Sequence, residues 1–151
     1  MARDDLSPTI IADDLLQRTG AAMLSGDAAS FTACFALPQE FETPAGKTVV
    51  NTVGHLTRVF EAVHLKYKAM GVTDMDRHVV FAEFRDKGTI AFTHESRLLQ
   101  GTVLLQAAFP VFSILKLIED TWLIASSSYG PTDDSIAGRA LNAGLQVAQS
   151  I

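Results

Sequence analysis

The chain has 151 residues, 48% of them hydrophobic and 19% charged, a length and composition that suit one globular domain and exclude a disordered segment. Its 17 acidic residues outnumber its 12 Lys and Arg residues, so the formal net charge is −5 at pH 7. Without a basic cluster, we expect no nucleic-acid partner and no binding to an anionic membrane surface. The one cysteine, Cys34, excludes an internal disulfide and a cysteine metal site.

The first residues do not resemble a secretion signal. Acidic residues stand where a signal peptide needs a basic flank, and no unbroken apolar stretch follows them. The apolar run at residues 103–118 is shorter than the ~20 residues that span a bilayer. We therefore expect a soluble cytoplasmic protein.

Two helices are predicted at the start of the chain. Ser7-Pro8 suits an N-cap followed by proline at the first helical position, and Ser25-Gly26 suits the end of that helix. Asp27 can cap a short second helix, which Leu37-Pro38 would end. The buried face of this second helix would consist of Phe31, Cys34 and Phe35.

A hairpin and a third helix are predicted next. Pro44-Ala45-Gly46 reads as a turn between two short strands at residues 39–43 and 47–51. A helix is then expected from about Thr52 to Met70, ending at Gly71, because apolar residues recur there with a strong helical period.

The second half of the chain predicts a sheet. Strands are expected at residues 77–85, 89–99, 103–118 and 121–129, joined by tight turns. Helices that precede such an antiparallel meander indicate a two-layer α+β domain, with three N-terminal helices packed on the sheet. We expect one domain over residues 1–151, with a core at about residues 9–130 and a C-terminal tail or helix at residues 131–151.

The alternation of residues along two strands predicts the faces of the sheet. In the strand at residues 89–99, the even-numbered positions should face the helices, which places His94 and Ser96 on an otherwise apolar inner face. The strand at residues 103–118 is apolar on both faces, so something should cover its outer face. We expect a homodimer joined through this outer face; the alternative cover is the C-terminal helix.

The order of these elements resembles the nuclear transport factor 2-like superfamily, which includes ketosteroid isomerase and the SnoaL-like polyketide cyclases. The resemblance covers roughly residues 9 to 130 and lies in loose motifs at residues 15–27, 31–35, 41–46 and 120–124. It implies a cone-shaped domain in which a curved, mainly antiparallel sheet and three helices enclose a deep, mostly apolar pocket.

Residues at the positions of the ketosteroid isomerase site exclude that enzyme's chemistry. In residues 41–46, Thr43 stands where the family has its general base, and Thr19 corresponds to the oxyanion tyrosine. Phe60 corresponds to a supporting tyrosine, and the protonated acid would lie near Val111. Because both the base and the oxyanion donors are missing, we expect no steroid isomerase activity.

His94 is the best remaining candidate for acid–base chemistry or for a hydrogen bond to a ligand. The alternative is a core histidine satisfied by a backbone carbonyl or by Ser96. The resemblance implies that Tyr129 would lie near the pocket mouth, which makes it a further catalytic candidate, and Asp76 is an outside candidate for a carboxylate at the pocket rim. No histidine pair has the spacing of a helical zinc site, so we expect no metal and no cofactor. The pocket implied by the resemblance would be lined by Thr19, Phe35, Thr43, Phe60, Phe92, His94, Ser96, Val111 and Tyr129.

Three functions are open at this point. The leading one is a protein that binds a small, largely apolar molecule in the pocket. The second is an enzyme (a dehydratase, cyclase or hydrolase) that uses His94 with Tyr129 or Asp76. The third is a non-catalytic homodimerisation domain. An open cavity beneath His94 favours the first two, and a pocket filled by phenylalanine side chains favours the third.

Overall fold

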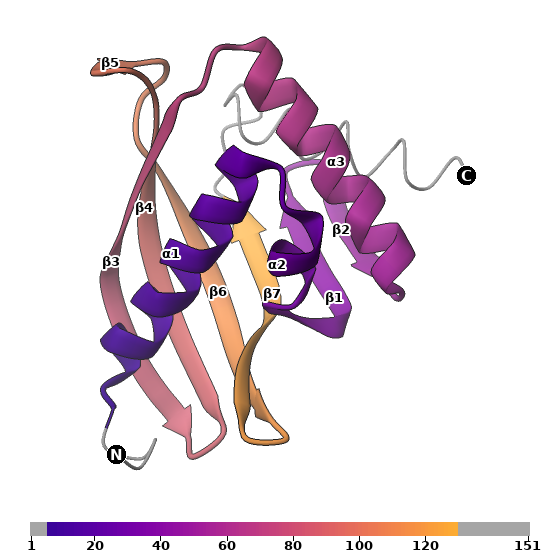
Figure 1. The fold of residues 1–151 in the computed structure, drawn as a ribbon. Coiled ribbons are helices and arrows are strands. Elements are labelled where there is room, and N and C mark those ends of the chain that lie inside the picture. Colours follow the sequence, from indigo (N-terminus) through magenta and orange to yellow (C-terminus); the bar gives the residue numbers. More distant parts are fainter. Residues whose placement is uncertain (1–5, 130–151) are drawn as a thin grey trace.

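The computed structural model describes residues 6–129, which form three helices and a seven-stranded sheet (Figure 1). The helices are α1 (Pro8–Ser25), α2 (Ala28–Thr32) and α3 (Val53–Ala69). The strands are β1 (Phe35–Thr43), β2 (Gly46–Val50), β3 (Asp74–Asp86), β4 (Thr89–Gln100), β5 (Val103–Leu104), β6 (Phe109–Ile118) and β7 (Thr121–Tyr129). This is the α+β architecture that the sequence predicted. The last predicted helix, at residues 131–151, lies outside the described residues.

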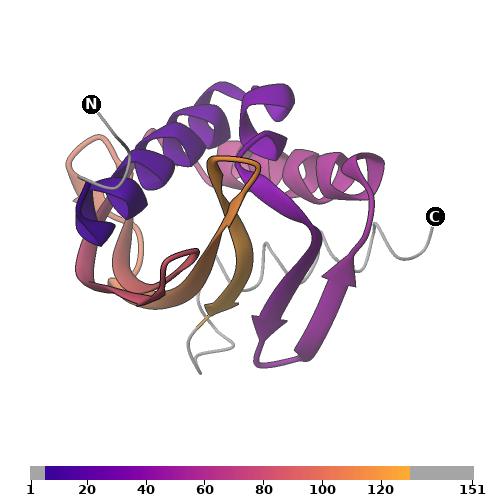
Figure 2. The same cartoon turned by 90° about the horizontal axis from the view of Figure 1, so that it is seen from below.

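The sheet has the strand order β2-β1-β7-β6-β4-β3, and β5 pairs with β4. Only the β1–β7 pair among the described strands is parallel. The sheet curls around the helices, which lie on its concave side (Figure 2). The β3–β4 register skips Val80 and the β6–β7 register skips Ala125, and such bulges bend a strand and increase its twist. The expected cone shape is therefore confirmed.

Side-chain caps start the helices where the sequence predicted them. The Ser7 hydroxyl accepts a hydrogen bond from the Ile10 amide at 3.1 Å, and the Asp27 carboxylate accepts one from the Ser30 amide at 3.1 Å. Helix α1 ends at Gly26, whose φ of 79° suits a residue without a Cβ. The boundaries of α3 also agree with the prediction, because Thr52 is its N-cap.

Two apolar clusters fill the concave side of the sheet, and β4 contributes to both. One cluster packs α1 against β4, β6 and β7, with Ile90 and Phe92 as the β4 members. The other packs α3 against β1, β4 and β6, with Leu98 as the β4 member. The predicted alternation along β4 is confirmed, since every even-numbered residue from Ile90 to Leu98 is buried. His94 and Ser96 lie on β4 between the two clusters.

The predicted second helix is too long. Helix α2 stops at Thr32, and Phe35 already belongs to β1. The carbonyl of Cys34 accepts a hydrogen bond from the Ile124 amide of β7 at 2.8 Å. At this residue, pairing with β7 replaces the hydrogen bonds of the helix. Pro38 lies inside β1, where the β1–β7 register is irregular and a missing amide is tolerated.

Two boundaries in the second half of the chain also differ from the prediction. The expected strand at residues 103–118 is interrupted, and only β6 forms the long strand. Buried and exposed residues alternate along β6, and its exposed side carries the apolar residues Phe112 and Ile118. Strand β3 begins at Asp74 rather than Arg77, because residues 74–76 extend the ladder with β4 up to Leu99.

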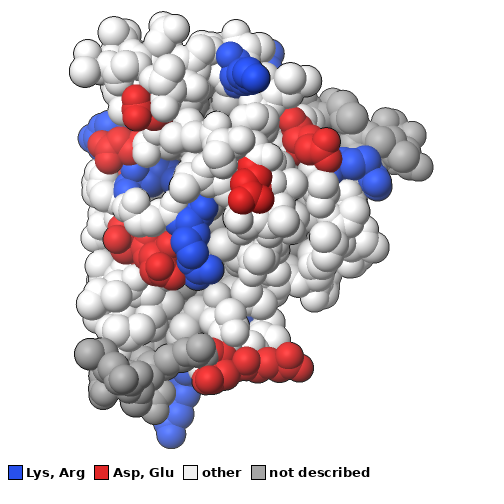
Figure 3. Space-filling model, in the orientation of Figure 1, with Lys and Arg blue, Asp and Glu red and all other residues white. Residues whose placement is uncertain are grey.

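The outer face of the sheet keeps exposed apolar side chains. Phe81 of β3 and Phe112 of β6 both pair with Thr93 of β4, so the three share a face, and Ile118 is also exposed at the end of β6. On the opposite, helix-covered side, acidic and basic side chains are interspersed and neither sign covers an extended area (Figure 3). The homodimer through the outer face of the sheet stays a prediction.

We expect Phe60→Ala to lower the free energy of unfolding by about 3–5 kcal/mol, because Phe60 is 1% exposed and its removal leaves a cavity under α3. Chemical denaturation measures this loss. The matched control is Leu65→Ala on the same helix, at 67% exposure, which should cost less than about 0.5 kcal/mol. A loss below about 1 kcal/mol for Phe60→Ala would contradict the packing described here.

We expect light scattering at micromolar concentration to show a homodimer. Phe112 is 40% exposed on the outer face, so Phe112→Lys should place a charge in the contact and shift the protein towards monomer. Leu65→Lys, on the helix side, should leave the mass unchanged. A monomeric wild-type protein, or a dimer that Phe112→Lys does not weaken, would show that the outer face is not the contact.

Candidate functional site

A cavity of about 80 Å³ lies between the helices and the concave face of the sheet. Most of its lining is apolar, with aromatic side chains from α2, α3, β1, β4 and β6. Several polar side chains also face it, from α1, α3 and four strands. These polar residues are Thr19, Tyr67, Arg77, His94, Ser96, Ser113, Ser127 and Tyr129.

Arg77 places a guanidinium group at this cavity. The inward-facing positions in this part of β3 are those of Met75, Arg77 and Val79. In the ladder between β3 and β4, Arg77 pairs directly with Ser96. Its Nη2 atom donates hydrogen bonds to the Leu16 carbonyl and, at 2.7 Å, to the Thr19 hydroxyl. These bonds connect β3 to α1.

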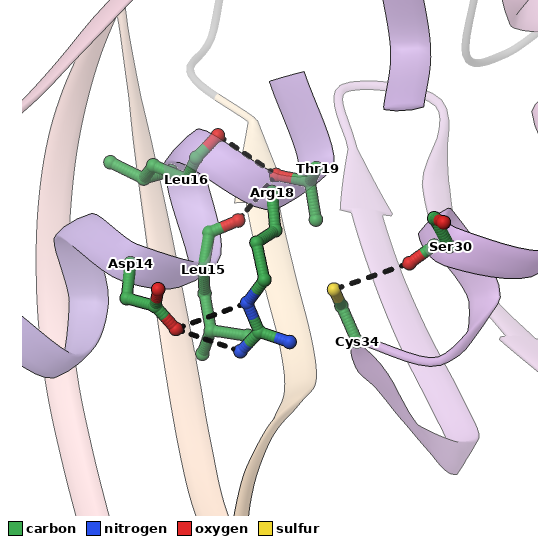
Figure 4. Close-up of polar contacts among 7 residues, drawn as sticks. All are labelled: Asp14, Leu15, Leu16, Arg18, Thr19, Ser30 and Cys34. Carbon is green, nitrogen blue, oxygen red and sulfur yellow. Dashed lines mark hydrogen bonds and ion pairs between the residues drawn. The ribbon is translucent and has the colours of Figure 1, made fainter. Parts of the chain in front are cut away.

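Two residues of helix α1 allow the guanidinium group of Arg77 to lie against the helix. The Thr19 hydroxyl donates to the Leu15 carbonyl at 2.8 Å (Figure 4), and its oxygen accepts the hydrogen bond from Arg77. A Cβ on Gly20 would lie 3.0 Å from Nη2 of Arg77, so glycine lets the group approach the helix. A glycine inside a helix costs roughly 0.5–1 kcal/mol relative to alanine, and this contact gives a reason for it.

The charge of Arg77 has no acidic partner among residues 6–129. No Asp or Glu of this range lines the cavity, and none forms an ion pair with the guanidinium. Burial lowers the pKa of Arg77, but an arginine starts from about 12 or higher and stays charged at neutral pH. A carbonyl and a hydroxyl therefore provide its partial compensation, and both are neutral groups.

His94 lies on the inner face of β4, as predicted, and is 5% exposed. Its ring stacks on Phe92 at a centroid distance of 5.9 Å. Nδ1 is buried without a hydrogen-bond partner within the described range. Burial, and after it the positive charges of Arg77 and His78, lowers the pKa of His94 to about 3. The imidazole is therefore neutral at physiological pH.

Two tyrosines complete the polar lining. Burial raises the pKa of Tyr67, on α3, and of Tyr129, at the end of β7, so both phenols keep their protons at neutral pH. Neither hydroxyl forms a hydrogen bond to a protein group in the described part of the chain. The cavity therefore combines one cation with neutral groups that can donate hydrogen bonds.

No family model matches the chain, and no curated protein matches it. Solved structures do. A protein of unknown function from Shewanella oneidensis MR-1, described as NTF-2 like, superimposes with a TM-score of 0.63 at 12% identity over 82% of this chain and 98% of its own. The chain has the nuclear transport factor 2-like (NTF2-like) fold.

Two further structures share this NTF2-like arrangement. A domain of unknown function with a cystatin-like fold from Nostoc punctiforme has a TM-score of 0.64 at 13% identity, over 83% of this chain and 80% of its own. Aln2 from a Streptomyces species has a TM-score of 0.64 at 19% identity, over 82% of this chain and 91% of its own. At these identities the likeness concerns the fold.

Most of the predicted site residues lie at the NTF2-like cavity. Eight of them line it: Thr19, Phe35, Phe60, Phe92, His94, Ser96, Val111 and Tyr129. Thr43 does not; its hydroxyl accepts a hydrogen bond from the Ala45 amide in the β1–β2 turn at 3.3 Å. Asp76 does not either, because it is exposed on the other side of β3 from Arg77, opposite Arg97. The predicted roles of the residues that line the cavity stay predictions.

Aromatic side chains narrow the cavity without filling it. Phe31 lies 4.6 Å from both Phe35 and Phe60, measured between ring centroids. All three rings line the cavity. The remaining space borders Arg77 and His94, so the pocket is neither widely open nor fully plugged.

Sequence reasoning missed Arg77 and Tyr67 as lining residues. The predicted strand began at residue 77 and no face was assigned to Arg77, although Met75, Arg77 and Val79 alternate as an inner face does. Tyr67 lies within the helix predicted from about Thr52 to Met70, and it is buried there. Tyr67 lines the cavity from α3.

Other candidate chemistries receive no support from the described residues. Cys34 is buried, its thiol contacts the Ser30 carbonyl at 3.5 Å (Figure 4), and burial raises its pKa, as for an unreactive core thiol. Within residues 6–129, no three metal-ligating side chains gather at one point. In the same range, no helix combines the length and apolar character needed to cross a bilayer.

We expect His94 to make the protein sensitive to acid. The unfolded chain takes up a proton on His94 near its ordinary pKa of 6.5 and the folded protein only near pH 3, so acid favours unfolding between these values. Between pH 7 and 5, wild type should lose about 2 kcal/mol more stability than His94→Gln. Denaturation at several pH values measures the difference, with exposed His78→Gln as the control. Parallel pH dependences of wild type and His94→Gln would contradict the burial of a neutral imidazole.

Proposed function

We propose that this protein binds a small, largely apolar molecule in the cavity of its NTF2-like fold. The observation that carries the proposal is the state of His94: a buried imidazole beside an apolar cavity, whose Nδ1 has no protein partner in the described part of the chain. Buried polar groups in folded proteins are nearly always hydrogen-bonded, and leaving one unpaired costs about 1–3 kcal/mol. A bound molecule with one polar group would remove that cost.

The size of the cavity restricts the ligand. Pockets for drug-sized ligands usually measure about 300–1,000 Å³, and an apolar cavity of about 150 Å³ holds benzene. At about 80 Å³, this cavity suits a ligand with a short aliphatic body. A larger molecule would require the ring cluster of Phe31, Phe35 and Phe60 to open.

Binding fits His94 better than acid–base catalysis does. An efficient general acid or base has a pKa near the working pH, whereas that of His94 is lowered to about 3. The neutral ring can still donate or accept a hydrogen bond. Of the other acid–base candidates, Asp76 lies outside the cavity, and Tyr129 keeps its proton at neutral pH because burial raises its pKa.

The dimerisation function would not explain the polar lining. A domain kept only for assembly has no need of an arginine and two tyrosines around an internal space, and apolar residues in these places would avoid the cost of desolvating them. Assembly through the outer face is compatible with ligand binding, since the two use opposite faces of the sheet.

The test is a titration followed by NMR, using four molecules of one length: butanol, butanamide, butylamine and butanoate. Binding of at least one should shift the amide resonances of His94, Ser96 and Val111. In Val111→Phe, the larger side chain projects into the cavity, and binding should be lost while the protein stays folded. Phe112→Leu, which alters the outer face of the same strand, is the matched control and should bind as wild type does.

Two results would contradict the proposal. One is the absence of binding for all four molecules at millimolar concentration. The other is binding that Val111→Phe leaves unchanged, because the molecules would then lie elsewhere on the protein.

A further inference from the structure

The cavity lining points to the chemical class of the ligand. We propose that Arg77 anchors a carboxylate, so that the ligand is a small carboxylic acid with its apolar body directed towards the phenylalanine rings. This inference rests on the proposed function and names the polar group that the ligand carries.

The first argument is the balance of charge at the cavity. Arg77 brings one positive charge, and no carboxylate from residues 6–129 lies against it. Arg77 is half-buried, and a charge that is partly removed from water without an ionic partner is costly, so such charges are normally paired. Here the pairing group is missing from the described part of the chain, and the charge borders a space that a ligand can enter.

The second argument is the hydrogen-bonding state of the guanidinium. Nη2 is already used by the Leu16 carbonyl and the Thr19 hydroxyl, which hold the group in place. Nε and Nη1 have no protein acceptor in the described part of the chain. Charge-assisted hydrogen bonds from arginine to a carboxylate are about twice as strong as neutral ones, and a held guanidinium loses little freedom when it forms them.

The third argument is the set of neighbours. Ser96 lies opposite Arg77 in the β3–β4 ladder, and His94 lies next to Ser96 along the same face. The protonated phenols of Tyr67 and Tyr129 line the same cavity. These neutral donors can satisfy the second oxygen of a carboxylate without adding charge.

The charges and hydrogen-bond donors that line the cavity favour a carboxylate over a phosphate. A phosphate monoester carries about −1.5 to −2 charges at neutral pH and three acceptor oxygens. The described lining offers one cation, a neutral histidine and limited space, which balance a single negative charge. The apolar remainder of the lining suits a hydrocarbon chain.

Arg77 also joins β3 to α1, so a purely structural role is the competing explanation. A structural arginine would affect stability but would not distinguish an acid from its amide. Butanoate and butanamide have nearly the same shape and differ in charge. The ratio of their affinities therefore isolates the ligand-anchoring role from the structural one.

The experiment measures the affinities of butanoate and butanamide at neutral pH by NMR titration of wild type, Arg77→Met, Arg77→Lys and Arg97→Gln. We expect wild type to prefer butanoate at least tenfold. Arg77→Met, which keeps an unbranched side chain, should abolish the preference, and Arg77→Lys should retain part of it. Arg97→Gln removes an arginine paired with Glu95 on the other face of the sheet and should behave as wild type.

The outcomes separate this inference from the proposed function. If wild type binds both molecules equally, or the amide better, Arg77 is not a carboxylate anchor, although the cavity still binds ligands. If neither molecule binds, and butanol and butylamine do not bind either, both proposals fail. A preference for butanoate that persists in Arg77→Met would place the anion elsewhere and overturn the inference. If Arg77→Met does not fold, the ratio of the affinities for butanoate and butanamide, measured in wild type and in Arg77→Lys, still tests the inference.

Discussion

The inner face of β4 is the element on which the rest of the structure depends. Its first half, with Ile90 and Phe92, packs under α1, and its second half, with Leu98, packs under α3. Alternation places every second residue of this strand in the interior, so the two polar residues between the clusters must be interior as well. The cavity lies where the two apolar clusters meet and where His94 and Ser96 replace apolar side chains.

The electrostatics of the cavity follow from this packing. Closing α1 over β3 desolvates Arg77, and helix α1 compensates with a carbonyl and a hydroxyl rather than with an acid. The retained charge acts on its neighbours, and with burial it keeps His94 neutral. A site with one fixed cation and neutral donors is suited to hold an anion, whereas proton transfer needs a group whose pKa lies close to neutral pH. Because one architecture can carry many different sites, it is this lining, rather than the NTF2-like fold, that points to a function.

Much of the fold could be predicted because its signals are local. Ser7, Asp27 and Thr52 mark helix starts through their own hydrogen bonds to the backbone, and the period of α3 is visible in its residues. The errors arose where pairing with a distant strand decided the outcome. Residues 33–35 leave the helix because β7 offers hydrogen bonds, and residues 74–76 join the sheet because β4 extends beside them. Neither partner is near in the sequence.

The same distinction separates what was known of the site from what was not. The sequence by itself determined that His94 and Ser96 face inward, because strand alternation is a property of the local backbone, and it showed that the acids of ketosteroid isomerase are missing. Only the tertiary structure decided that Arg77 belongs to the site and that Thr43 and Asp76 do not. The position of Arg77 depends on α1 crossing β3 some 60 residues away in the chain, where Leu16 and Thr19 meet the guanidinium. Contacts at that separation have no local pattern, and they arise only when the helix packs on the sheet.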